Sequence, residues 1–403
     1  MLSSNSFFKN FSFEKKVFNK NINQTKKIFK SFQIDLENFE IPMLESYYKS
    51  YNFDFSQEVI KKFSKFENII IIGMGGSILG AKSIYSFFRH RVKKKIFFFD
   101  NLDSSLNLQY SKIRNLKNSC YIIISKSGNT LETIVNLNII LSKHTLPKKF
   151  VFITEAKDSS LIEIANNFGA EIIEHKEFIG GRYSVLSETG MFPAALMGFN
   201  IQKFKNLEKL VNDKKFVSSL IYNVASIYTL NKQNIKNSVI LNYDSDLQDL
   251  SYWYQQLIGE SLGKDGKGIT PIISTTPKDH HSVLQLYLDG PKDKFFTFFS
   301  SKDKKDKYKI KKKPIPASLT FLKNKRLNFV INAQCKATQN IFKRKNIPYR
   351  YFVFNKEKEE ELGMIFTFFV LETILLARLM HVDPFNQPAV EQIKKETKKI
   401  LLK

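Results

Sequence analysis

The sequence predicts an α/β protein with two doubly wound parallel sheets and helical segments at both ends. From about residue 66 onward, short apolar runs rich in β-branched and aromatic residues alternate with helical periods, which is typical of parallel sheets covered by crossover helices. The runs form two series, and a helical pattern over residues 191–235 separates them. Turns rich in glycine and serine directly follow two runs of the first series, at the position where open α/β sheets bind ligands.

The composition is that of a globular chain with a sizeable core. The 403 residues are 43% hydrophobic and 25% charged, which excludes disordered and collagen-like chains. Cys120 and Cys335 are too few to staple this fold or to build a cysteine-rich zinc site. The first residues lack a long apolar segment, so we expect a cytoplasmic protein. Glu372 and Arg378 interrupt the apolar run Met364–Met380, which therefore predicts a buried helix and not a membrane span.

The net charge of +25 raises the question of nucleic acid or an anionic surface as a partner. The excess is mostly lysine, and it is spread along the whole chain, including segments with the pattern of core strands. No signature of a nucleic-acid-binding module accompanies it. We therefore expect a general bias in residue usage, with neither nucleic acid nor a membrane as partner.

The ends of the chain predict helices. The N-terminal part is rich in Phe and Lys with few Gly or Pro, and we expect its helices to pack on the first sheet unit. The C-terminal part predicts two helices, Glu357–His381 and Gln387–Leu402, with a break at Asp383–Pro384. Five segments result: an N-terminal helical segment 1–60, a first sheet unit 61–190, a helical bridge 191–235, a second sheet unit 236–356 and C-terminal helices 357–403.

The expected strands are short and rich in Ile, Val, Phe and Tyr, as buried strands are. Those of the first unit are Asn68–Ile72, Ile96–Phe99, Tyr121–Ile124, Phe150–Thr154 and Glu171–Glu174. Those of the second unit are Ser238–Tyr243, Ile269–Ser274, Phe295–Phe299, Leu327–Ile331 and Arg350–Phe354.

The first strand leads directly into the glycine-rich turn Gly73–Gly80. Such a turn exposes backbone N–H groups at a helix N-terminus, where an anion is favoured. A dinucleotide-binding fingerprint would need Gly in place of Ile78, and a Walker A loop would need Lys in place of Ala81. These residues alone are consistent with an anion site or with a tight turn from strand to helix.

The third strand ends at a second turn, Ser125–Thr133, after which a helical period begins. Its hydroxyl groups, a lysine and a glycine can satisfy phosphate oxygens with side chains and backbone amides together. The alternative is a plain helix N-cap, which needs one hydroxyl and at most one Glu of a capping box. The number of donors favours the phosphate site.

Together with Gly73–Ser77, the second turn resembles the sugar isomerase domain, a doubly wound module that holds sugar phosphates. Further segments resemble the phosphoglucose isomerase family. They occur in the family's order, and the resemblance spans about residues 70–400. These segments are Gly180–Ser184, Gly259–Lys264, Asp279–Gln285, and Asp383–Pro388 with Lys394.

The resemblance implies an aldose–ketose isomerase of glycolysis and gluconeogenesis. It would open the ring of glucose 6-phosphate or fructose 6-phosphate and move a proton between C2 and C1 through a cis-enediol, with no metal or other cofactor. Two alternatives stay open: a dual-specificity enzyme that also accepts mannose 6-phosphate, and a non-catalytic protein that binds sugar phosphates.

The resemblance also implies roles for individual residues. Glu260 would be the base for the C1–C2 proton, and Arg182 would stabilise the enediol oxygens. His281 would assist ring opening together with Lys394. It is chosen over the adjacent His280 because Gln285 follows at the family's interval. Substrate binding is assigned to Ser77, Ser125, Lys126, Ser127, Thr130, Gln256 and Gln387.

Each assignment has a plain structural alternative. Glu260 lies near the end of the helical run Asp246–Leu262, where a carboxylate can simply face solvent, and Lys394 is one lysine among several in a basic helix.

The family works as a homodimer in which the neighbouring subunit supplies the histidine. We therefore expect a homodimer that binds hexose 6-phosphates, with His281 donated across the interface.

Overall fold

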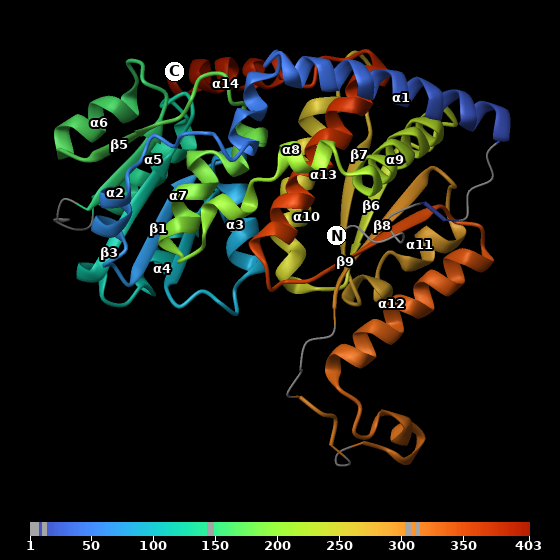
Figure 1. Cartoon of the computed structure of the whole chain (residues 1–403). Coiled ribbons are helices and arrows are strands. Elements are labelled where there is room, and N and C mark those ends of the chain that lie inside the picture. The colour runs from blue at the N-terminus through green and yellow to red at the C-terminus, as the bar shows by residue number, and fades with distance from the viewer. Residues whose placement is uncertain (1–7, 10–13, 143–148, 303–307, 312–314) are drawn as a thin grey trace.

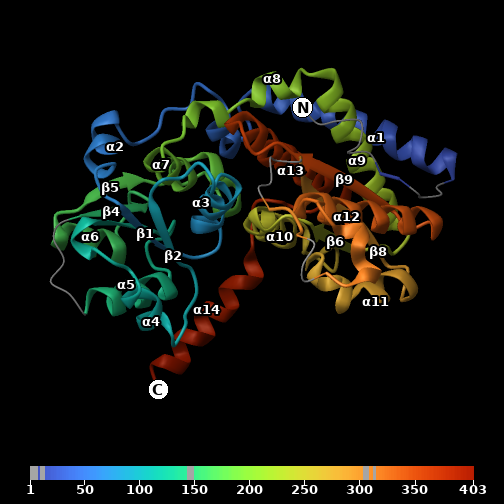
Figure 2. The same ribbon diagram turned by 90° about the horizontal axis from the view of Figure 1, so that it is seen from below.

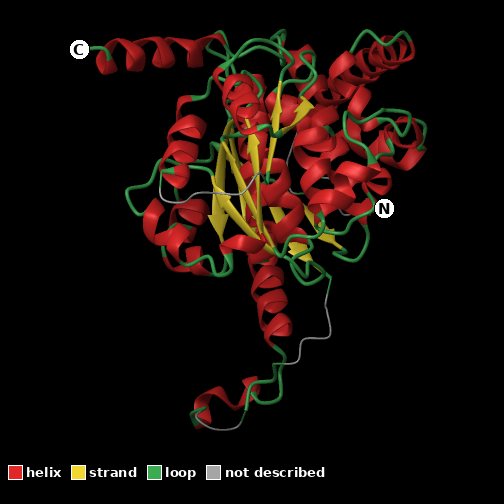
Figure 3. Ribbon diagram, turned by 90° about the vertical axis from the view of Figure 1, so that its left-hand side faces the viewer, coloured by secondary structure: helices red, strands yellow, loops and turns green. Residues whose placement is uncertain are grey.

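The computed structural model describes residues 8–9, 14–142, 149–302, 308–311 and 315–403. Two parallel sheets lie side by side, and helices cover their faces (Figures 1 and 3). This is the predicted fold class.

The first sheet has the strand order β2-β1-β3-β4-β5, and all its strands are parallel. Every residue of β1 and β3 is buried, as expected for strands covered on both faces. The strands are β1 (Asn68–Gly73), β2 (Lys95–Phe99), β3 (Ser119–Ile124), β4 (Phe150–Thr154) and β5 (Glu171–Glu174); the helices between them are α3 (Gly76–Phe87), α4 (Leu106–Ser111), η3 (Leu116–Asn118), α5 (Leu131–Leu141) and α6 (Ser160–Phe168).

The second sheet has the order β7-β6-β8-β9 and is also entirely parallel. Its strands are β6 (Asn237–Asn242), β7 (Thr270–Thr275), β8 (Lys294–Ser301) and β9 (Tyr349–Phe354); its helices are η6 (Ser245–Leu247), α10 (Gln248–Leu262), η7 (Lys278–His281), α11 (Leu284–Asp289), η8 (Ala317–Leu322) and α12 (Leu327–Arg344).

The predicted strand Leu327–Ile331 is wrong, because these residues form the first turns of α12. The run is short, and periodicity over five residues does not separate a strand from the start of a helix. The buried residues further along, Cys335, Thr338, Gln339 and Phe342, recur at helical spacing. Leu327 and Phe329 are instead half exposed, at 50% and 53%, because this end of α12 projects from the body of the protein (Figure 1).

Residues 191–235 contain helices and no strand, as predicted. The predicted packing of the N-terminal helices on the first unit is correct for η2 (Pro42–Tyr47), which contacts η4 (Gly181–Leu186), and for α2 (Gln57–Phe63), whose Lys62 pairs with Glu171 of β5 at 2.9 Å. It is wrong for α1 (Lys15–Glu37), which packs on α9 (Lys214–Lys232) and α13 (Glu359–Met380). An ion pair of 2.5 Å between Asp35 and Arg378 fastens α1 to α13. The elements concerned are α1 (Lys15–Glu37), η2 (Pro42–Tyr47), α2 (Gln57–Phe63), η4 (Gly181–Leu186), α7 (Glu188–Leu196), η5 (Ile201–Phe204), α8 (Leu207–Val211), α9 (Lys214–Lys232) and α13 (Glu359–Met380).

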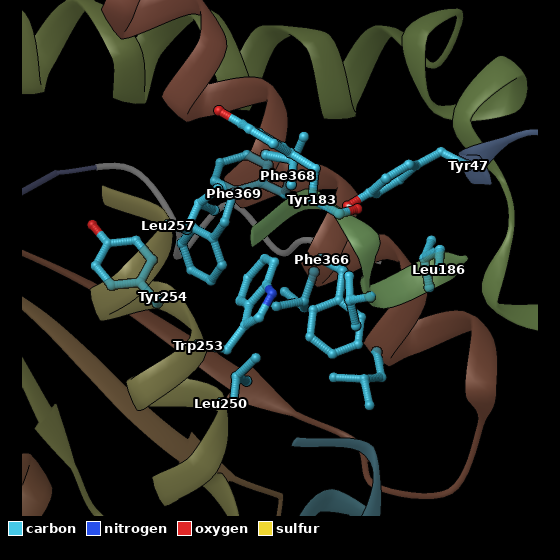
Figure 4. Close-up of a cluster of buried hydrophobic side chains, with 14 of the residues drawn as sticks. Tyr47, Tyr183, Leu186, Leu250, Trp253, Tyr254, Leu257, Phe366, Phe368 and Phe369 are labelled. Carbon is cyan, nitrogen blue, oxygen red and sulfur yellow. The ribbon is translucent and has the colours of Figure 1, made fainter. Parts of the chain in front are cut away.

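Helix α13 forms the centre of the core. By length and composition it could cross a membrane, but 94% of its most apolar window is buried inside the protein, as predicted for this run. Trp253 of α10 packs edge-on against Phe366 of α13, with ring centroids 4.7 Å apart (Figure 4). Glu372 is fully buried and pairs with Arg350 of β9, which satisfies both charges.

The last helix, α14 (Pro388–Leu401), has no buried residue. It extends away from the rest of the fold, as Figure 2 shows. The predicted helix is therefore present, but no neighbour within the described chain covers it.

Candidate functional site

The two hydroxyl- and glycine-rich turns meet at one edge of the first sheet. Strands β1 and β3 are parallel neighbours, and Gly73 pairs with Ile124 at their carboxyl ends. The chain moves outward from β1 to β2 and then crosses back to β3, so the turns lie at the point where the strand order reverses. Ligands of doubly wound sheets bind at this position.

The turn after β3 holds its hydroxyls together. The Ser125 and Thr130 hydroxyl oxygens lie 2.8 Å apart, and the Ser127 hydroxyl accepts the backbone N–H of Asn129 at 3.3 Å. Thr130 is the N-cap residue of α5, but its side chain does not cap the helix. Gly128 has φ +66°, and a Cβ there would lie 2.1 Å from Ser159 Oγ, so the turn requires glycine.

Lys126 of the same turn is engaged elsewhere. Its Nζ donates to the backbone oxygen of Glu177 at 2.7 Å and lies 3.6 Å from a carboxylate oxygen of Glu155. Burial lowers the pKa of Lys126, and the Glu155 charge opposes that shift. The side chain therefore helps hold β4 and the segment after β5 beneath the turn.

The turn after β1 packs directly on the segment that carries Arg182. Helix α3 begins at Gly76, and a Cβ on Gly76 would lie 2.2 Å from the backbone carbon of Gly181. Only glycine permits this approach. Ser77, next to the contact, is 8% exposed.

Arg182 is buried, and its guanidinium organises the site. Nε donates to Ser261 Oγ at 2.8 Å, and Nη2 donates to the backbone oxygens of Pro384 and Asn386. Nη1 donates to side chains only, reaching Glu260 Oε2 at 3.1 Å and Gln387 Oε1 at 2.9 Å. Every N–H that a guanidinium carries is thus used.

Glu260 lies on the last turn of α10, between Arg182 and Gln256. Its Oε1 accepts from Gln256 Nε2 at 3.0 Å, and its side chain is 34% exposed. Gln256 Oε1 is buried and has no hydrogen-bond partner among the described residues. A Cβ on Gly75, which has φ +53°, would lie 3.0 Å from Gln256 Nε2, so Gln256 lies between the carboxylate and the glycine turn.

Two predicted residues are not in this cluster. His281 is exposed at the end of η7, while its neighbour His280 shares a 2.7 Å hydrogen bond between Nε2 and Tyr243 OH. Burial, and then the His281 charge, lower the pKa of His280. Lys394 Nζ donates to Glu391 Oε1 at 2.6 Å on exposed α14. The structure therefore brings together Arg182, Glu260, Gln256 and Gln387, but neither His281 nor Lys394.

A family model described as phosphoglucose isomerase matches residues 50–282, more than half of the chain. The chain belongs to the phosphoglucose isomerase family. It is 33% identical over 353 residues to a glucose-6-phosphate isomerase of Methanocaldococcus jannaschii, covering 85% of this chain and 86% of that protein. It is 33% identical over 369 residues to one of Campylobacter jejuni, covering 86% and 88%.

Solved structures support the fold of this phosphoglucose isomerase family member. A crystal structure of a hypothetical protein from Thermus thermophilus superposes with a TM-score of 0.81 and 21% identity, covering 96% of each chain. A glucose-6-phosphate isomerase from Chlamydia trachomatis gives a TM-score of 0.70 at 18% identity, covering 85% of this chain and 71% of that one.

Sequence reasoning missed two residues of this family member's site, Tyr183 and Ser261. The Tyr183 hydroxyl donates to the backbone oxygen of Pro384 at 2.9 Å and lies 2.9 Å from Ser261 Oγ. Both residues fall inside segments that carry the family resemblance, directly after Arg182 and Glu260 in sequence. Their position inside these segments could have identified them as site residues. Their residue types could not, because neither a tyrosine nor a serine by itself indicates a role in catalysis.

Proposed function

We propose that the chain is an aldose–ketose isomerase that interconverts glucose 6-phosphate and fructose 6-phosphate. One observation carries the proposal: a partly buried carboxylate, Glu260, is held by a buried arginine, Arg182, beside the hydroxyl-lined carboxyl edge of a doubly wound sheet. Family membership supports it independently. Cytoplasmic glycolysis and gluconeogenesis would be its setting.

In this proposal the phosphate binds at the turns, where Ser125, Ser127, Thr130 and Ser77 present hydroxyls and backbone N–H groups. The phosphate does not react. Holding it lets binding energy orient C1 and C2 against the base.

Glu260 then takes the proton from C2 of the open-chain aldose. The C–H electron pair forms the C1–C2 double bond, and the carbonyl oxygen at C1 gains a proton, which gives the cis-enediol. Loss of the proton from the C2 hydroxyl and return of the Glu260 proton to C1 gives the ketose. A positioned base of this kind contributes about 10²–10⁴ in rate.

Arg182 would stabilise the enediol oxygens through Nη1. Its Nε and Nη2 are bound to Ser261 and to backbone oxygens, whereas both acceptors of Nη1 are side chains that can rotate. Nη1 is therefore the edge of the guanidinium that can turn to a substrate oxygen. Gln256 Oε1, buried and unpaired among the described residues, would accept a hydroxyl proton of the substrate.

We further propose that the enzyme is a homodimer in which the partner subunit's His281 completes each site. The exposure of His281 supports this. Two exposed apolar regions also support it. One is formed by Phe321 of η8 and by Leu327 and Phe329 at the start of α12, which are 66%, 50% and 53% exposed; the other is formed by Ile393 and Ile400 of α14, which are 71% and 62% exposed. Lys394 would reach the active site once α14 is packed against the neighbouring subunit.

The test is isomerisation by Glu260→Gln, with Glu163→Gln on the surface helix α6 as matched control. We expect the control to keep the kcat of the parent and Glu260→Gln to lower kcat by about 10²–10⁴-fold. Glu260→Gln should also lose the exchange of tritium from C2 into solvent. Retained exchange would refute the base assignment. Turnover of mannose 6-phosphate at a comparable rate would show the dual-specificity enzyme, and binding without turnover by the unaltered protein would show a sugar-phosphate sensor.

A further inference from the structure

A cavity of about 420 Å³ lies between the bridge helices and the amino end of α13. None of its lining residues belongs to the candidate active site. Helices α8, α9 and α13 contact one another around it (Figure 1). Lys302 and Asn355 of its lining follow β8 and β9 directly, so the cavity opens at the carboxyl edge of the second sheet, where α/β proteins bind ligands. Its volume is within the usual range for small-molecule sites, about 300–1,000 Å³.

The floor of the cavity is apolar and is backed by the core. Leu210, Phe216 and Met364 line it and are at most 9% exposed. The ring of Phe216 is backed by an edge-on contact with Phe368 of the core, at 5.7 Å between centroids. An apolar or aromatic group placed here would find a preformed surface.

The rim carries four lysines: Lys209, Lys215, Lys302 and Lys358. All four are exposed, and none pairs with a carboxylate within the described part of the chain. Other lysines do pair; Lys356, for example, lies within 2.7 Å of both Asp244 and Asp246. Unpaired ammonium groups around a partly open cavity favour an anionic ligand.

Three carboxylates also line the cavity, and two of them accept hydrogen bonds from backbone N–H groups. Asp213 accepts the backbone N–H of Phe216 at 2.8 Å and caps α9. Glu361 accepts the backbone N–H of Asn355 at 3.4 Å. With Glu360 as the third, the lining keeps one positive charge in excess.

We propose that this cavity binds an organic phosphate. Its apolar or aromatic part would lie on Leu210, Phe216 and Met364, and its phosphate groups would pair with the rim lysines, which suit phosphate as point charges. A neutral ligand would leave the lysines unused, and inorganic phosphate would leave the apolar floor unused. The site is separate from the proposed isomerase site.

Calorimetric titration of the full chain with ATP, adenosine and tripolyphosphate tests both halves of the proposal. Saturating fructose 6-phosphate is included so that the isomerase site is occupied. We expect ATP to bind, and adenosine and tripolyphosphate to bind more weakly. The double variant Lys209→Glu/Lys358→Glu should weaken ATP binding about tenfold or more, while Lys336→Glu/Lys343→Glu on α12, with the same change in net charge, should not.

The proposal would be overturned by no binding of ATP, by equal binding of ATP and tripolyphosphate, or by equal loss in both double variants. If ATP binds only when fructose 6-phosphate is omitted, it occupies the isomerase site and the second site is likewise refuted. If fructose 6-phosphate does not bind, the proposed function fails, and the comparison of the two double variants still decides the second site.

Discussion

The Nη1 atom of Arg182 donates to Glu260 Oε2 at 3.1 Å and to Gln387 Oε1 at 2.9 Å. A single buried guanidinium therefore joins η4, the end of α10 and the loop before α14. These three segments lie far apart in the sequence, and the charge that would stabilise the enediol also sets the position of the base.

Arg182→Lys should abolish most of the activity. A lysine ammonium is a point charge that cannot reproduce the fork of the guanidinium, so the oxygens of Pro384 and Asn386 would lose donors together with Glu260. We expect kcat/KM to fall about 10²–10³-fold, measured by steady-state kinetics with fructose 6-phosphate. Arg344→Lys, on exposed α12, is the control. A near-normal kcat/KM in Arg182→Lys would contradict the proposed role.

Gly76→Ala should destabilise the protein and disturb the site. The new Cβ would lie 2.2 Å from the backbone of Gly181, and backbone cannot yield as a side chain can. We expect a loss of about 1–3 kcal/mol in the free energy of unfolding, measured by urea denaturation. Gly259→Ala has 3.8 Å of clearance from Pro271 and should be as stable as the parent or more so, because alanine favours the helix.

Mixing two inactive variants tests the shared site. If His281 acts in its partner's site, Glu260→Gln and His281→Ala subunits exchanged into mixed dimers regain one intact site per mixed dimer. Activity should recover to about a quarter of the parent value after random exchange. No recovery, with dimers verified by sedimentation, would place His281 in its own subunit's site, and full activity of His281→Ala before mixing would place it outside catalysis.

Lys205 should make stability depend on pH. It is fully buried, its Nζ lies 3.7 Å from the centroid of Phe53 and has no hydrogen-bond partner among the described residues, and burial lowers its pKa to about 7. The unfolded chain, with an ordinary lysine pKa of about 10.4, then binds more protons than the folded one. Stability should therefore rise from about pH 7 toward pH 10.

Urea denaturation of Lys205→Met across that pH range measures this effect. The variant should lose the rise, and it should be more stable than the parent at pH 7 and below by up to a few kcal/mol. Exposed Lys203→Met serves as the control. A pH profile of Lys205→Met parallel to the parent's would show that the amine stays charged in the folded protein. Burial also raises the pKa of neighbouring Glu188, which acts in a lower pH window.

Much of the site could be predicted because the motifs keep their order along the chain. The runs ending at Gly73 and Ile124 are apolar and β-branched enough to be strands whatever surrounds them, and the residues after parallel strands must share one edge. The placement of His281 and Lys394 could not be reached this way. Both lie on exposed elements, and their positions relative to Glu260 depend on surfaces that a neighbouring subunit would cover.

By itself, the sequence determined the alternation of strands and helices, the two turns and the residue types of the site, because hydrophobic period and turn chemistry are local properties. Only the tertiary structure decided that Leu327–Ile331 is helical, that α1 packs on α9 and α13, and that Arg182 binds the loop of Pro384 and Asn386. These outcomes depend on which distant surfaces are available for packing, and a short stretch of sequence carries no information about them.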